Sequence, residues 1–268
     1  MKLAIRHETL YRYTSPLTYT IQQLRLTPRV ETHQHLLSWT IDTSGQRHAF
    51  TDAYGNLCHM LTITDSHDTV RIVVTGEVEV LPLDKGRLLE NGTLSPLVFT
   101  VPTRLTEVTD YIQAFAEKNL QGTGSTELLK LAAAICGAVA YQSGATAVTS
   151  TANDALQLGQ GVCQDHAHLF IACCHTRNIP VRYVSGYIDS GSTGHAESHA
   201  WVDVWVEELD FTGWVSIDVT HACFASDAHC RLAVARDYDS AAPVSGVRRG
   251  GGEESLNVSV KVVPLCAQ

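Results

Sequence analysis

The chain has 268 residues, of which 44% are hydrophobic and 18% are charged. This high apolar content with modest charge excludes a disordered chain, and the length suffices for one large domain or two medium ones. The net charge of −9 at neutral pH opposes contact with phosphate backbones and with anionic lipid. We therefore expect neither nucleic acid nor a membrane surface as a partner.

The first residues contain no apolar segment typical of a signal peptide, and no run reaches the roughly 18 apolar residues that a spanning helix needs. Eight cysteines among 268 residues fall below the density of a disulfide scaffold. The sequence also lacks a Cys-x-x-Cys pair, which disfavours a zinc ribbon. Together these features predict a cytoplasmic protein whose cysteines are reduced.

Residues 1–80 have the pattern of short strands separated by turns. Apolar and polar side chains alternate over 3–13, and further β-type runs follow at 17–21, 36–41, 61–63 and 70–80. Turn residues lie between these runs, at Ser15-Pro16, Thr27-Pro28, Ser44-Gly45 and Tyr54-Gly55-Asn56. Alternating strands with regular turns predict an N-terminal β-sandwich.

The composition changes at 81–104, where prolines and glycines gather. We place a domain boundary there and expect a first domain at 1–85 and a second at 86–268. Helical periodicity follows, at Thr106–Glu117, from Ser125 or Thr126 to Val139, and after a Thr151/Asp154 capping box. After Pro180 strands return, at Val181–Ile188, Ser198–Val206, Gly213–Val219 and Leu256–Val262, with a loop at Gly191–Gly194. Helices followed by an antiparallel sheet indicate the α+β class.

A helix beginning at Cys163 is the first chemical feature of the second domain. Its predicted buried face carries Cys163, Ala167, Phe170, Ile171 and Cys174. A cysteine in the first turn meets unpaired N–H groups and the positive end of the helix dipole, which favour the thiolate. The same N–H groups can hold a developing oxyanion. For a second oxyanion donor, the sequence offers Tyr141, Gln142 and Gln160 without choosing among them.

A base for such a thiolate comes from the predicted hairpin at Ser198–Val206 and Gly213–Val219. His199 lies on one face of the first strand, and Asp218 shares a face with Trp214 on the second. A turn centred between Glu208 and Leu209 would place His199 directly opposite Asp218, near enough for the carboxylate to fix the imidazole tautomer. A slip of one residue would put the two on opposite faces.

These segments resemble the transglutaminase-like superfamily of cysteine enzymes. The matching motifs are Gly161-Val162-Cys163-Gln164-Asp165-His166-Ala167-His168, Arg182-Tyr183-Val184-Ser185-Gly186-Tyr187, Ser198-His199-Ala200-Trp201-Val202 and Gly213-Trp214-Val215-Ser216-Ile217-Asp218. The segments Arg236-Asp237-Tyr238 and Pro243-Val244-Ser245-Gly246 are similar to the tail of its bacterial branch, and Tyr11-Arg12-Tyr13 with Asp52-Ala53-Tyr54-Gly55-Asn56 to that branch's N-terminal region.

The resemblance implies a papain-like core with Cys163 as nucleophile, His199 as base and then acid, and Asp218 as the orienting carboxylate. It implies attack on a peptide or glutamine-type amide through a thioester, with no cofactor and no metal. We expect hydrolysis, because transfer to an amine requires a site that excludes water. The alternatives are transamidation, acetyl transfer of the arylamine acetyltransferase kind, and a catalytically idle interaction module.

Several residues near these motifs invite other interpretations. Val219 and His221 stand where the family has proline and asparagine after the aspartate, which puts the precision of the triad in doubt. The histidines and cysteines of the Cys163 helix could suggest zinc, but His168 and His175 point away from the others on a helix. Tryptophans 201, 205 and 214 could line an acyl cleft, although core packing is the commoner role.

Overall fold

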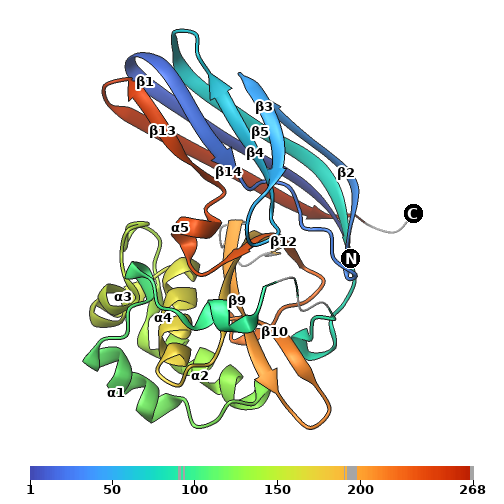
Figure 1. The fold of residues 1–268 in the computed structure, drawn as a ribbon, viewed down its shortest axis with the longest axis vertical. Helices are drawn as coiled ribbons and strands as arrows, with labels where there is room; N and C mark the ends of the chain where they lie inside the picture. Colours follow the sequence, from blue (N-terminus) through green and yellow to red (C-terminus); the bar gives the residue numbers. More distant parts are fainter. Residues whose placement is uncertain (90–91, 93, 190, 192–197, 266–268) are drawn as a thin grey trace.

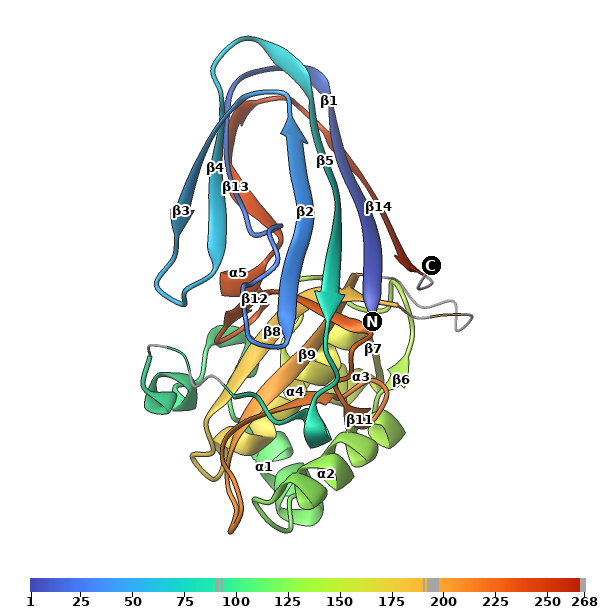
Figure 2. The ribbon, with the colours of Figure 1, turned by 90° about the vertical axis from the view of Figure 1, so that its right-hand side faces the viewer.

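The protein, described by a computed structural model over residues 1–89, 92, 94–189, 191 and 198–265, consists of two bodies stacked end to end. One body contains only strands, and the other carries the helices and a second sheet (Figure 1). The N-terminus lies where the two bodies meet (Figure 2). This division agrees with the predicted order of a β region followed by an α+β region.

A single long strand, β1 (Lys2–Leu24), organises the first body. It pairs with β5 (His67–Val80) through its first half and with β4 (Leu57–Ile63) through its second. The outer strands are β2 (Gln34–Thr43) beside β5 and β3 (Gln46–Thr51) beside β4. The predicted turn at Ser15-Pro16 lies where β1 folds back: its two halves pair antiparallel with β5 and with β4, which a short turn joins, and its register with β5 shifts between Arg12 and Leu17 (Figure 2).

The expected sandwich is present: the seven strands form one hydrogen-bonded sheet among the described residues, and this sheet folds over into two facing layers (Figure 2). Leu3 and Ile5 from the first half of β1 share a core with Leu17 and Leu24 from the second half. Because β1 folds back between its halves, the two layers stay hydrogen-bonded to each other through it. They enclose a common apolar interior.

The last two strands of the chain complete this first sheet. β13 (Val244–Gly250) and β14 (Glu254–Pro264) both pair antiparallel with β1. The predicted strand at Leu256–Val262 is thus present, but the division into 1–85 and 86–268 does not describe sheet membership. An alternating pattern predicts a strand but not the strand with which it pairs. Here the pairing strand is β1, more than 200 residues earlier in the chain.

The segment joining the bodies runs through three short 3₁₀ turns, η1 (Asp84–Gly86), η2 (Pro96–Thr100) and η3 (Arg104–Thr106). Leu88 and Phe99 pack there on Trp214 of the second sheet. The expected helix at Thr106–Glu117 begins later, as α1 (Asp110–Asn119), because Thr109 caps it through the Ile112 N–H.

Three further helices precede the second sheet. They are α2 (Ser125–Ala138), α3 (Ala152–Leu158, with the predicted Thr151/Asp154 box) and α4 (Cys163–His175); β6 (Ala140–Tyr141) pairs with β7 (Gln160–Gly161) between them. Residues Gln164–His175 are all buried, so the prediction of a single buried face on α4 is too narrow. Strands cover one side of α4 and α1–α3 cover the rest. No helix in the described part of the chain is long and apolar enough to span a membrane.

The second sheet has the order β11-β10-β9-β8-β12 and is antiparallel. Its strands are β8 (Val181–Ile188), β9 (Ser198–Glu207), β10 (Thr212–Asp218), β11 (Cys223–Phe224) and β12 (His229–Ala235), followed by α5 (Tyr238–Ala241). Of the expected loop at Gly191–Gly194, all but Gly191 lie outside the described residues.

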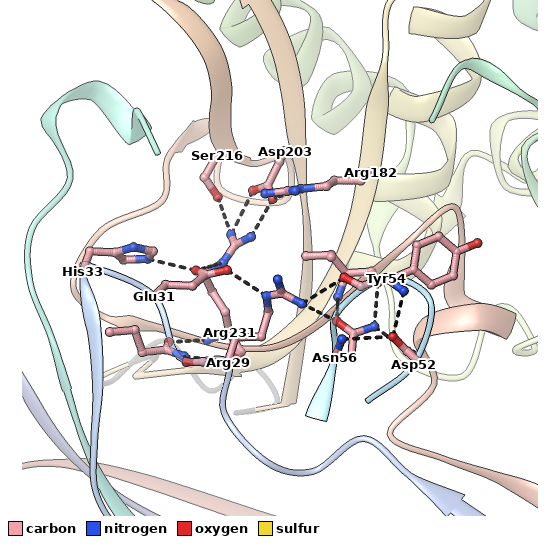
Figure 3. A network of polar contacts seen from close by, with 12 residues as sticks. Arg29, Glu31, His33, Asp52, Tyr54, Asn56, Arg182, Asp203, Ser216 and Arg231 are labelled. Atoms are coloured by element: carbon pink, nitrogen blue, oxygen red, sulfur yellow. Dashed lines mark hydrogen bonds and ion pairs between the residues drawn. The ribbon is translucent and has the colours of Figure 1, made fainter. Parts of the chain in front are cut away.

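A buried ionic network joins the two bodies (Figure 3). Arg231 of β12 is 2% exposed and forms ion pairs with Glu31, at 2.8 Å, and with Asp203, at 2.6 Å. Glu31 belongs to the segment between β1 and β2, whereas Asp203 lies on β9. The network therefore fixes the first body against the sheet that carries the candidate site.

Candidate active site

The start of α4 is shaped so that Cys163 occupies its first turn. The Val162 N–H donates to Oδ2 of Asp165 at 2.8 Å, and the Thr146 hydroxyl donates to the same oxygen at 2.7 Å. A Cβ on Gly161 would lie 2.8 Å from Asp165, so glycine is required before this turn. Burial raises the pKa of Asp165, whose carboxylate nevertheless closes the helix end. Cys163 itself is half-buried and reachable from solvent.

The hairpin carrying His199 and Asp218 has a different register from the predicted one. Ser216 pairs with Asp203 rather than with Trp201, a shift of two residues. The turn is closed by the Glu208 N–H donating to the Phe211 carbonyl at 2.8 Å, so its centre lies one residue later than expected. A shift of two keeps every side chain on its predicted face. Consequently His199 and Asp218 still meet, diagonally rather than directly.

His199 connects the thiol to the carboxylate. Its Nε2 donates to Oδ2 of Asp218 at 2.9 Å, and Cys163 lies near enough to its ring to contribute to its pKa. Because Nε2 faces the carboxylate, Nδ1 is the nitrogen left for the sulfur. Burial alone would lower the pKa of His199, but the hydrogen bonds to Asp218 and Cys163 raise it to about 10. This raised pKa favours an imidazolium beside Cys163.

The neighbours of the imidazole hold its plane. The Trp201 ring stacks on it with centroids 6.0 Å apart and donates its indole N–H to the Ser216 hydroxyl at 3.0 Å. Gly186 of β8 lies opposite His199, and a Cβ there would come within 2.5 Å of the Trp201 ring. Trp201 and Trp214 are fully buried, which supports the core interpretation of these tryptophans over a cleft.

Asp218 accepts from two more histidines. Nδ1 of His221 lies 2.7 Å, and Nε2 of His229 lies 3.0 Å, from the same Oδ2 that faces His199. Burial would raise the pKa of Asp218, but these three rings hold it well below its ordinary value. The sequence drew attention to His221 but not to His229, because nothing in the local pattern places the first residue of β12 beside the end of β10.

The other histidines considered as metal ligands are spread apart. His166 bonds to the Val139 carbonyl, His168 accepts from the Tyr238 N–H, and His175 bonds to the Phe99 carbonyl. Within the described residues, the His/Cys/Asp/Glu atoms close enough to share an ion are instead those of His199, Asp218 and His229.

A cavity of about 150 Å³ lies at the junction of the two bodies. It reaches Ser198, which precedes His199, and its mainly apolar walls include Tyr11, Tyr238, Leu256 and Val258. Burial raises the pKa of the Tyr141 phenol, and the nearby charge of Cys163 raises it further.

Comparisons with known proteins match both parts of the chain. Residues 110–219 match the model of the transglutaminase-like superfamily, and residues 3–79 match that of the bacterial transglutaminase-like N-terminal region. Together the two matches span more than half of the chain. Residues 110–219 belong to the transglutaminase-like superfamily, and residues 3–79 are the bacterial transglutaminase-like N-terminal region. At the family level this supports a cysteine-dependent enzyme that acts on amides.

Individual relatives of this transglutaminase-like chain cover nearly all of it. A protein of Mycobacterium tuberculosis described as uncharacterized is 29% identical over 97% of this chain and 92% of its own. One of Mycobacterium leprae, also described as uncharacterized, is 28% identical over 98% and 99%. The solved structure of a "Putative Cysteine Protease" from Cytophaga hutchinsonii superposes with a TM-score of 0.78 at 23% identity, covering 100% of this chain and 92% of that one, which shows the same fold.

Proposed function

We propose that the protein is a cysteine hydrolase that cleaves a peptide or glutamine-type amide through a thioester on Cys163. The observation that carries this proposal is that His199 is hydrogen-bonded to Asp218 and interacts through its ring with Cys163. A nucleophile bonded to a base, which is in turn oriented by a carboxylate, is the arrangement that activates a thiol. We assign these three residues the roles of nucleophile, base and then acid, and orienting group.

The steps follow from the positions of the groups. The Cys163 thiolate attacks the amide carbon, and the carbonyl electrons move to oxygen, where the Cys163 N–H at the start of α4 can stabilise them. As the C–N bond breaks, His199 gives its Nδ1 proton to the departing amine. The neutral imidazole then takes a proton from water, and the hydroxide attacks the thioester. Collapse of the resulting tetrahedral intermediate breaks the C–S bond and releases the carboxylic acid, which leaves the Cys163 thiolate beside the protonated ring and restores the resting pair.

Hydrolysis is favoured over transamidation because Cys163 is half-buried rather than sealed. Water at its full concentration competes with any amine for a thioester that solvent can reach. The cavity beside Ser198 offers room for one side chain of the substrate, so a peptide or protein is the substrate class we propose. The seven described cysteines are all unpaired, which supports the further proposal of a reducing, cytoplasmic setting.

Incubation with glutamine-containing peptides and with amide-linked fluorogenic peptides, each with and without a primary amine, tests the proposal. We expect release of ammonia or amine by the wild type and none by the Cys163→Ala variant. Incorporation of the amine faster than hydrolysis would establish transamidation instead. Product formed only from a coenzyme A thioester would establish acetyl transfer, and equal turnover by both variants would refute cysteine catalysis.

A further inference from the structure

The Asp218 carboxylate holds more donors than the orientation of one imidazole requires. Its Oδ2 faces His199, His221 and His229 at 2.7–3.0 Å, and its Oδ1 accepts the His221 N–H at 3.2 Å. Asp218 is completely buried and His229 is 5% exposed. The other titratable groups within its field are His166 on α4, Cys136 on α2 and Cys223 on β11.

The tautomer of His229 is set by the backbone beside it. The Ser226 N–H donates to Nδ1 of His229 at 3.1 Å, so Nδ1 carries no proton. The ring proton therefore lies on Nε2, which points at Asp218. A nitrogen that carries this proton has no lone pair for a metal ion, although the ligand atoms of His199, Asp218 and His229 lie within 4.8 Å of one another. The cluster is therefore arranged for hydrogen bonding.

We infer that His229 is a positioning residue of the active site, which as a neutral Nε2–H donor keeps Asp218 ionised and aimed at His199. The inference rests on the proposed function, because it concerns the same three groups. His229 does not touch the thiol. It acts through the Asp218 carboxylate. Without this donor the carboxylate would accept fewer hydrogen bonds and would rotate more freely about χ2.

The position of His229 is in turn fixed by the first body. Two residues further along β12, Arg231 is clamped by the ion pairs to Glu31 and Asp203 (Figure 3). Its backbone N–H donates to Gln34 Oε1 at 2.7 Å, and its carbonyl accepts from Gln34 Nε2 at 2.9 Å. Glu31, between β1 and β2, and Gln34, the first residue of β2, therefore hold the start of β12, and with it His229, beside Asp218.

The test compares His229→Leu, which removes the donor, with His229→Gln, whose amide can donate from nearly the same place. His175→Gln is the matched control, because His175 is equally buried but bonds to the Phe99 carbonyl away from the site. The readouts are the rate at which iodoacetamide modifies Cys163, followed by peptide mass spectrometry from pH 4 to 9, and kcat and KM for an amide substrate.

For His229→Leu we expect kcat to fall about 10–100-fold with little change in KM, and the acid midpoint of alkylation to rise by about one pH unit. His229→Gln restores both to near wild type, and His175→Gln leaves both unchanged. A lower rate whose midpoint stays in place, once corrected for folded protein, would reduce His229 to a structural role. A wild-type Cys163 that reacts no faster than the exposed Cys223 would instead overturn the proposed function itself.

Discussion

Replacement of Asp218 by asparagine changes the charge at the centre of the site while keeping its shape. In the wild type, one carboxylate oxygen of Asp218 accepts from three imidazoles. The asparagine amide would present an N–H₂ donor to some of these imidazoles in place of an acceptor. A hydrogen bond to a charged group contributes about 1.5–3 kcal/mol, so loss of the His199 bond alone lowers kcat/KM by about 10–100-fold. Burial of His199 remains, so its pKa falls from about 10 and the imidazolium is lost near neutral pH.

The assay for this variant is the rate of Cys163 alkylation at pH 6, measured together with kcat/KM for an amide substrate. Asp68→Asn, on the exposed surface of the first sheet, is the matched control and leaves both rates unchanged. Thermal unfolding separates loss of folded protein from loss of reactivity. An Asp218→Asn variant that is alkylated at pH 6 as fast as the wild type would refute the reasoning, because the carboxylate would then contribute nothing to the imidazolium.

Three further predictions concern the framework. Burial opposes ionisation of Glu31, but Arg231 and Arg29 lower its pKa to about 2, so the stability that its charge contributes is complete above about pH 4.5 and is lost toward pH 2. Glu31→Gln should therefore flatten the fall of the unfolding free energy between about pH 4.5 and about pH 2. Urea titrations that show the same fall with pH in the variant as in the wild type would contradict this. Gly186→Ala places a Cβ 2.2 Å from the Cys230 carbonyl and 2.5 Å from Trp201, so chemical denaturation should show a loss of about 1–3 kcal/mol, and wild-type stability would disprove the close packing. Burial lowers the pKa of His7 to about 4, so stability falls as pH drops from 6.5 to 4, and His7→Gln reduces that fall, which melting temperatures across the range can check.

The candidate site was predictable from sequence because each of its parts has a local signature. A glycine before Cys163 and a helical period after it place the thiol in a first turn, and Pro180 separates that helix from the strand that follows. The hairpin register was predicted two residues away from the observed one, since the loop at Glu208–Phe211 has no turn signature. His199 and Asp218 still share a face of the sheet, because side chains alternate between the two faces with a period of two along a strand.

The features that sequence did not predict depend on long-range pairing. The strand β14 alternates clearly, yet only the folded chain shows that it pairs with β1. The polar interior of Arg231, Glu31 and Asp203 is likewise assembled from three distant segments. His229 reaches Asp218 for the same reason, since the network that positions its strand has no pattern within β12 itself.

The most direct measurement is the acyl-enzyme itself. Rapid acid quench of the wild-type protein during turnover of an amide substrate, followed by mass spectrometry of its peptides, should reveal the acyl group on the peptide that contains Cys163. The adduct should disappear in Cys163→Ala and should form more slowly in Asp218→Asn. Turnover that proceeds without any adduct on Cys163, or with the acyl group on another residue, would contradict the account.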